Sequence, residues 1–438
     1  MKSKKIISIC LFLFLFIQFS MAQKENELKK SNIDFDKFFI SKTLRIDYFL
    51  TGNSNSETVS FNEMREEPYW GGSKTNLIDK FNYGNFRIRV FDSLTNQLLY
   101  SKGFSTLFEE WQSTKEAKVL NKAFYQCAVI PYPKKTIRFE IDKRVYEDCE
   151  FYKIFDIYIN PNNYFIKHEK PKYCKATKII SSGDADKNID IAFLAEGYTK
   201  NEMSKFREDV KRIFGYITAA KPFDKYKNKF NVYAVESISD ESGTDVPGEG
   251  IYKNTALNTS YYTFDVDRYL TTFDMKSLHD YAANVPYDQI YVLINSKRYG
   301  GGGFFNYYTA STVDNILTPK VCVHEFGHGF AGLADEYYTS NVAYNDFYNL
   351  KTEPWEPNIS TMVNDDKKWK DMVKKATPVP TPRTKEFENT VGFFEGGGYV
   401  AKGIYSPYQD CRMKSNKAKG FCPVCQRAIE RMIKFYCE

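Results

Sequence analysis

The chain has 438 residues, of which 42% are hydrophobic and 17% aromatic. This composition excludes a wholly disordered protein and allows two or three folded domains, because disordered chains are poor in aromatic side chains. The 61 basic and 55 acidic side chains give a formal net charge of +6. Such a small excess gives no reason to expect a nucleic-acid partner.

The first 22 residues have the pattern of a secretory signal peptide. Three lysines precede an apolar run over residues 6–17, and the small residues Ser20 and Ala22 stand before the expected cleavage at Gln23. As a helix this run would cover about 18 Å, against about 30 Å for the hydrocarbon core of a membrane. We therefore expect an exported protein that is secreted, periplasmic or on the cell surface, and that keeps no membrane span after cleavage.

Residues 23–165 are predicted to form an N-terminal β-sandwich domain. Apolar side chains alternate with polar ones in four segments of this region, as in strands that bury one face. These segments are 44–50, 86–90, 137–141 and 155–159.

Residues 166–438 are predicted to form a second domain that mixes helices and strands, so the whole chain belongs to the α+β class. Residues 189–194 are nearly all apolar, which is typical of a strand buried on both faces. Thr199 and Glu202 have the spacing of a capping box, and apolar residues then recur at helical spacing over 203–217. Further strands are predicted at 230–235 and 290–294, and a further helix at 276–283.

The chain reads His-Glu-Phe-Gly-His from His324 to His328. On a helix, positions i and i+4 lie one turn apart on the same face, so both imidazoles can bind one zinc ion. Glu325 is rotated by about 100° from His324 and can act as general base on a water that the metal activates. The spacing therefore predicts a zinc site with Glu325 as the catalytic residue.

Two imidazoles do not complete a catalytic zinc site, so a third protein ligand is needed. Gly332 can adopt the left-handed conformation that ends a helix, which would turn Asp335 back toward the metal. We predict Asp335 as this ligand. Glu336, His279 or a more distant carboxylate are the alternatives.

Eight cysteines remain once Cys10 is removed with the signal segment. An even number fits a disulfide set in an exported protein. Cys422 and Cys425 also have the spacing of metal ligands, and Cys411 precedes them by a short interval. Because no fourth ligand is evident, we predict a disulfide from Cys411 to Cys422 or Cys425 rather than a second zinc site.

An acidic, glycine-containing loop offers a possible calcium site. Its carboxylates belong to Asp240, Glu241, Asp245 and Glu249. The spacing is not that of an EF-hand, so a solvated loop is the simpler interpretation.

Several motifs together resemble the immunoglobulin A peptidase family of bacterial zinc metallopeptidases. They are HEFGHGFAGLADEYY from His324, DESGTDVPGEGIY over 240–252, FEGGGY over 394–399 and the cysteine motifs of 411–425. The resemblance covers most of residues 188–438, and the β-rich region before them resembles the family's N-terminal domain. It implies an exported bacterial endopeptidase with a metzincin-like catalytic domain.

The metzincin clan usually has HExxHxxGxxH or HExxHxxGxxD, and here Gly332 and Asp335 each stand one residue later. The resemblance implies a methionine turn beneath the zinc, for which Met413 is the candidate. Some metzincins place a tyrosine two residues after this methionine to polarise the substrate carbonyl. Ser415 occupies that position, so Tyr405 or Tyr408 would have to take such a role. Residues 300–309 would supply an edge strand that binds extended substrate.

The predicted function is therefore an exported zinc endopeptidase that hydrolyses extracellular proteins. Immunoglobulin A and mucin-type glycoproteins are the candidate substrates. The alternative is a secreted glycan- or protein-binding adhesin with an inert zinc domain, although the intact Glu325 disfavours it. We expect a monomer.

Overall fold

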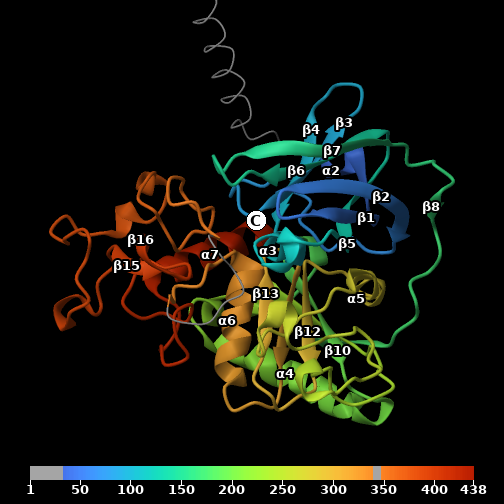
Figure 1. Ribbon diagram of the computed structural model, residues 1–438. Helices are drawn as coiled ribbons and strands as arrows, with labels where there is room; N and C mark the ends of the chain where they lie inside the picture. The colour runs from blue at the N-terminus through green and yellow to red at the C-terminus, as the bar shows by residue number, and fades with distance from the viewer. Residues whose placement is uncertain (1–32, 339–346) are drawn as a thin grey trace, which may run out of the picture.

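The computed structural model describes residues 33–338 and 347–438. The predicted signal segment, including Cys10, lies outside this range. The described chain mixes helices with several sheets (Figure 1), as the α+β prediction requires. No helix in these two ranges is both long and apolar enough to cross a membrane.

Two four-stranded sheets form the N-terminal region, at the top of Figure 1. Their strand orders are β5-β1-β2-β8 and β4-β3-β6-β7. The alternating apolar residues that predicted these strands lie in one shared core. The strands and short helices are α2 (Phe35–Phe38), β1 (Phe39–Asn53), β2 (Ser56–Glu67), β3 (Phe86–Asp92), β4 (Leu98–Phe104), α3 (Leu107–Gln112), β5 (Lys122–Pro133), β6 (Ile137–Arg144), β7 (Phe151–Ile159) and β8 (Ile166–Lys167).

A six-stranded sheet of order β13-β14-β12-β10-β11-β9 forms the centre of the second half. The inner strands β14, β12, β10 and β11 are parallel, and both edge strands are antiparallel to their neighbours. All eight residues of β10 are buried, as its apolar run predicts. The strands are β9 (Ala176–Ile180), β10 (Ile189–Glu196), β11 (Phe230–Val235), β12 (Gln289–Ile294), β13 (Gly301–Phe304) and β14 (Tyr308–Thr312).

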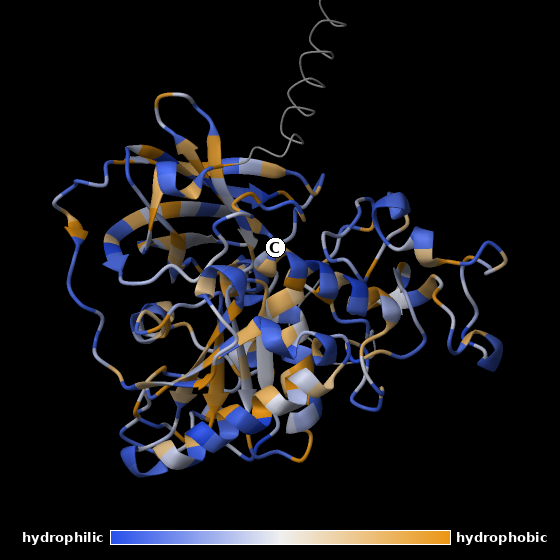
Figure 2. Cartoon of the chain, turned by 180° about the vertical axis from the view of Figure 1, so that it is seen from behind, coloured by the Kyte–Doolittle hydropathy of each residue, from blue (hydrophilic) through white to orange (hydrophobic). Residues whose placement is uncertain are grey.

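Helices cover both faces of this sheet. Side chains of α4 (Met203–Ala219), α6 (Thr318–Ala331) and α7 (Pro423–Cys437) share a core with one face. The other face packs with α5 (Met275–Ala282) and with the core of the N-terminal sheets. In Figure 2 the strands between these layers are largely hydrophobic, whereas the outer helices carry hydrophilic stretches toward solvent.

The regions before and after residue 165 are packed against each other. One hydrophobic cluster runs from the N-terminal sheets to β10 and β12. A partly buried ion pair also joins the two regions, because Arg45 Nη2 of β1 lies 2.7 Å from Asp280 Oδ1 of α5. The C-terminal part adds a hairpin of β15 (Phe394–Gly397) and β16 (Val400–Ser406) beside α7 (Figure 1).

Candidate metal centre and active site

Helix α6 presents His324 and His328 on one face and ends where the sequence places a glycine. Gly332 caps the helix with φ of 61° and ψ of 33°, the left-handed conformation that glycine adopts without steric cost. The residues after it have no regular secondary structure and turn back along the helix. This reversal brings Asp335 to the two imidazoles.

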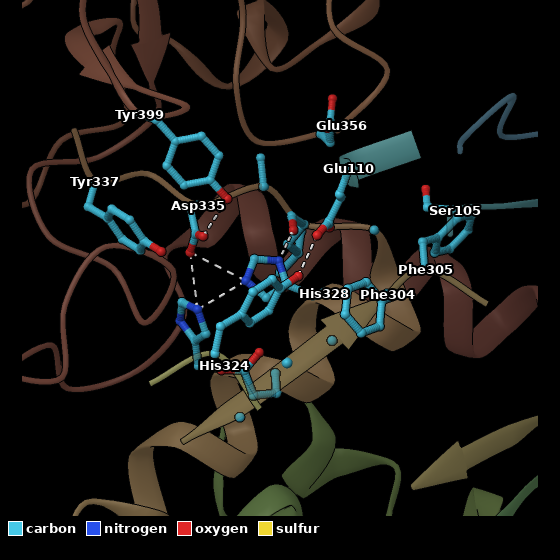
Figure 3. A pocket seen from close by; sticks show the side chains of 18 of the residues that line it. Ser105, Glu110, Phe304, Phe305, His324, His328, Asp335, Tyr337, Glu356 and Tyr399 are labelled. Carbon is cyan, nitrogen blue, oxygen red and sulfur yellow. Dashed lines mark hydrogen bonds and ion pairs between the residues drawn. The ribbon is translucent and has the colours of Figure 1, made fainter. Parts of the chain in front are cut away.

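Three donor atoms converge at this turn, as Figure 3 shows. His324 Nε2 and His328 Nε2 are 3.0 Å apart, and Asp335 Oδ1 lies 3.1 Å and 3.3 Å from them. Ligands of a tetrahedral zinc ion with bonds of about 2.0–2.1 Å are about 3.3 Å apart. The spacing of the three donors therefore fits one metal ion of that size.

Backbone carbonyls fix the orientation of both imidazoles. His324 Nδ1 donates to the carbonyl oxygen of Arg412 at 2.9 Å, and His328 Nδ1 donates to that of Leu333. Because Nδ1 is the donor in both rings, Nε2 is the atom that each imidazole directs at the common point, where its lone pair is available in the neutral form. Metal-binding histidines commonly have this second hydrogen bond, so the donor set fits a cation.

The electrostatics of the cluster also favour a positive charge. Burial lowers the pKa of His328, but Asp335 outweighs it and raises the pKa to about 9. Burial raises the pKa of Asp335, but the two imidazoles outweigh it and hold this pKa well below its usual range. Asp335 therefore remains ionised, and its Oδ2 accepts a hydrogen bond from Tyr399 at 2.8 Å.

Glu325 lies beside this cluster, and one of its carboxylate oxygens is within 4.8 Å of a ring nitrogen of His324 and of His328. Its side chain meets the edge strand β13, where a Cβ added to Gly301 would come within 2.9 Å of Glu325 Cγ. Burial raises the pKa of Glu325. A raised pKa makes a carboxylate at the wall of a cleft a stronger base, which suits proton transfer.

The cluster opens into a cleft of about 380 Å³. One part of its lining is the edge strand β13, and another part comes from the N-terminal region through Asn85, Ser105, Glu109 and Glu110. Burial and the neighbouring Glu110 raise the pKa of Glu109 to about 8. The N-terminal region thus contributes directly to the surface that a bound molecule would contact.

The structure brings other tyrosines to this cleft than those the sequence predicted. Tyr405 and Tyr408 are not among the described residues that line it, and the Tyr408 hydroxyl donates to Asn389 instead. Tyr337 and Tyr399 lie beside Asp335 (Figure 3). Because Tyr399 is 64 residues away from Asp335 along the chain, no local spacing could have indicated this contact.

Met413 packs against α6, where a Cβ added to Gly327 would lie 3.0 Å from the Met413 sulfur. Its side chain has no exposed surface and shares a core with Phe326 and Phe330 of that helix. Its backbone carbonyl accepts a hydrogen bond from Glu336 N at 2.8 Å. The segment around Met413 thus supports both the helix and the turn that carries Asp335.

The remaining histidines lie elsewhere. His279 is buried in α5, its Nδ1 is 2.9 Å from the hydroxyl of Tyr287, and burial lowers its pKa to about 3. His168 has 58% of its side chain exposed and lies 3.3 Å from Glu66. Neither of them reaches the cluster on α6.

The structure shows no disulfide in the part of the chain that it describes, where every cysteine is a free thiol. Cys411 Sγ and Cys425 Sγ are 3.7 Å apart, whereas a disulfide bond measures about 2.05 Å. Both approach Cys422 and Glu336 in a buried cluster. The prediction missed Glu336 because it lies 75 residues before Cys411 in the sequence.

The acidic loop at 240–249 is held by protein contacts. Its carboxylates accept hydrogen bonds from Lys253, Asn254 and Arg298. Within the described ranges, they are not among the groups whose ligand atoms converge as at a metal site. The geometry therefore gives no support to the calcium prediction.

The fold and the cluster on α6 together define a candidate metal-dependent hydrolase. The family model described as IgA Peptidase M64 matches residues 177–390 and 383–433, and that of the Peptidase M64 N-terminus matches residues 34–155. The chain therefore belongs to the IgA peptidase M64 family, which identifies it as a peptidase. A comparison with curated proteins found no match.

Proposed function

We propose that this protein is an exported zinc endopeptidase with a metzincin-like catalytic site. The observation that carries the proposal is the convergence of His324 Nε2, His328 Nε2 and Asp335 Oδ1 within 3.3 Å of one another. These three side chains would hold the ion. Zinc bound there supplies Lewis acidity toward a peptide carbonyl and toward a water molecule.

The chain's own residues would then carry the protons. Glu325 lies next to the donor triangle and lines the same cleft, so it can take a proton from the attacking water and deliver it to the leaving amine. Tyr337 and Tyr399 flank Asp335 at the cleft. They are better placed than Tyr405 or Tyr408 to contact a substrate carbonyl.

Substrate would lie along β13 as an extended segment. This strand is at the edge of the six-stranded sheet and lines the cleft through Gly301, Gly302 and Gly303. An edge strand offers backbone hydrogen-bonding groups to a peptide. Because these hydrogen bonds involve only the main chain of the peptide, they depend little on its sequence. Specificity would then come from side chains in the walls of the cleft, including Glu109 and Glu110. The proposed substrate is immunoglobulin A or a mucin-type glycoprotein.

A secreted adhesin with an inert metal site is the less favoured alternative. A site that only binds metal has no need of a carboxylate beside the ligands. Glu325 nevertheless faces the cleft as part of its lining, which supports the catalytic interpretation.

The test uses the purified full chain with casein, gelatin and immunoglobulin A as substrates. Proteolysis should stop on addition of a chelator and return with Zn²⁺, and H328A should lose both zinc and activity. H168A is the matched control, because His168 is an exposed histidine away from the cleft. Cleavage that persists in H328A, or that a chelator leaves unchanged, would refute the proposal.

A further inference from the structure

Behind the candidate active site lies a second cluster of metal-ligating side chains. Ligand atoms of Glu336, Cys411, Cys422 and Cys425 all lie within 4.8 Å of one another, and all four side chains are buried. We propose that these four residues form a second, structural metal site that takes a thiophilic divalent cation of the zinc class. This proposal does not rest on the peptidase chemistry.

The distances agree with ligands of one ion. In a tetrahedral zinc site with Zn–S bonds of about 2.3 Å, neighbouring sulfur atoms are about 3.8 Å apart, and sulfur and carboxylate oxygen are about 3.5 Å apart. Cys411 Sγ lies 3.7 Å from Cys425 Sγ, and Cys425 Sγ lies 3.3 Å from Glu336 Oε1. Three thiols and a carboxylate supply four ligands, which is the number in structural zinc sites, and each is a ligand type that zinc accepts.

Backbone amides point at the sulfur atoms, as expected for metal-bound thiolates. Cys422 N donates to Cys411 Sγ at 3.2 Å, and Cys425 N donates to Cys422 Sγ at 3.5 Å. Cys422 is the N-cap of α7 and Cys425 lies in its first turn. The positive end of the helix dipole there stabilises negatively charged sulfur.

Glu336 gives an independent sign that a cation belongs in this cluster. Its side chain has no exposed surface, and Oε2 has no hydrogen-bond partner, whereas Oε1 accepts from Asn358 at 2.9 Å. None of the ion pairs found within the described ranges includes Glu336. A buried carboxylate with one unsatisfied oxygen and no cationic partner is costly, and a metal ion would satisfy it.

The chemistry of the donors selects the ion. Thiolate ligands favour zinc over magnesium or calcium, which prefer oxygen. The site is closed, because all four protein ligands are buried and leave no position for a substrate. A structural role follows rather than a catalytic one.

Such an ion would tie together the segments that support the candidate active site. Glu336 follows Asp335 directly, and Cys411 precedes Arg412, whose carbonyl accepts from His324 Nδ1. Cys422 and Cys425 add the start of α7. The ion would therefore hold the third donor and the support of the first imidazole at a fixed separation.

The test measures metal content and the cobalt spectrum of the full chain. Wild-type protein should bind two metal ions per chain, and the double variant H324A/H328A should keep one. After cobalt substitution, this double variant should retain an intense thiolate-to-cobalt charge-transfer band. C411S and C425S should lose that band and one ion. C437S is the control, because Cys437 lies in α7 with Cys425 but outside the cluster, and this variant should keep the band and both ions.

Two results would overturn the proposal, and neither depends on whether the cysteine variants fold. One is a folded H324A/H328A protein that binds no cobalt or shows no charge-transfer band. The other is a disulfide between two of the three cysteines, detected by mass spectrometry of non-reduced peptides from the intact chain. Wild-type protein that binds both ions but cleaves none of the test substrates would contradict the proposed function without contradicting this second metal site.

Discussion

Two donor clusters lie on opposite sides of one short segment, and they differ in access to solvent. Asp335 faces the cleft with His324 and His328, whose side chains are 16% and 15% exposed. Glu336, the next residue, faces the three cysteines in the core. Catalytic zinc sites keep a position open, whereas structural sites are closed by four protein ligands.

The two sets of metal-ligating side chains also differ in the number of donors and in their relation to the cleft. The first cluster has three donors and a neighbouring carboxylate, Glu325, and all four residues line the cleft. The second has four donors and no cleft residue among them. The open cluster is therefore equipped to act on a substrate, and the closed one to hold its surroundings in place.

The sharpest way to test the open cluster is to remove its base and keep its ligands. E325Q should lower kcat by at least about 100-fold, because general-base catalysis contributes about 10²- to 10⁴-fold. Zinc content, fold and KM should change little, since Glu325 is not expected to bind the metal. E241Q makes the same change in the exposed acidic loop and should leave kcat unaltered; an E325Q enzyme within tenfold of the parent would refute the assignment.

The two adjacent carboxylates offer a reciprocal test of the comparison. D335A should lower the affinity of the open site for its metal ion by about 10- to 100-fold or more and abolish activity, while the cysteine cluster keeps its ion. E336A should lower the affinity of the cysteine cluster for its ion and should reduce activity less than D335A does. Metal content and competition with a chelator measure both effects. If E336A strips the open site while D335A retains it, the two residues have been assigned to the wrong clusters.

Local pattern was sufficient to predict the elements that carry the open site. The apolar run of 189–194 predicted β10, and the spacing of His324 and His328 placed both on one helical face. Gly332 was predicted as the end of that helix, and the structure gives it the left-handed conformation that this requires. Each of these features depends on residues close together in the chain.

Features built from distant segments could not be predicted in this way. The contact of Tyr399 with Asp335 and the cleft wall from Glu109 depend on tertiary packing. The same is true of Glu336 among the cysteines. For this reason the spacing of the cysteines left a disulfide and a metal site as alternatives, and only the fold supplied a fourth ligand.

The smallest effect is expected at the turn that separates the two clusters. G332A adds a Cβ at φ of +61°, where it would lie 2.8 Å from Cζ3 of Trp355. The left-handed conformation alone costs a non-glycine residue about 1 kcal/mol, and this contact adds to it. Chemical denaturation should therefore show a free energy of unfolding lower by at least about 1 kcal/mol, and the open site should bind its metal ion less tightly.

G215A is the matched control, because an added Cβ meets nothing within 4 Å in helix α4 and should be neutral or stabilising. Equal stability of G332A and the parent would mean that the turn tolerates alanine and does not by itself fix the position of Asp335.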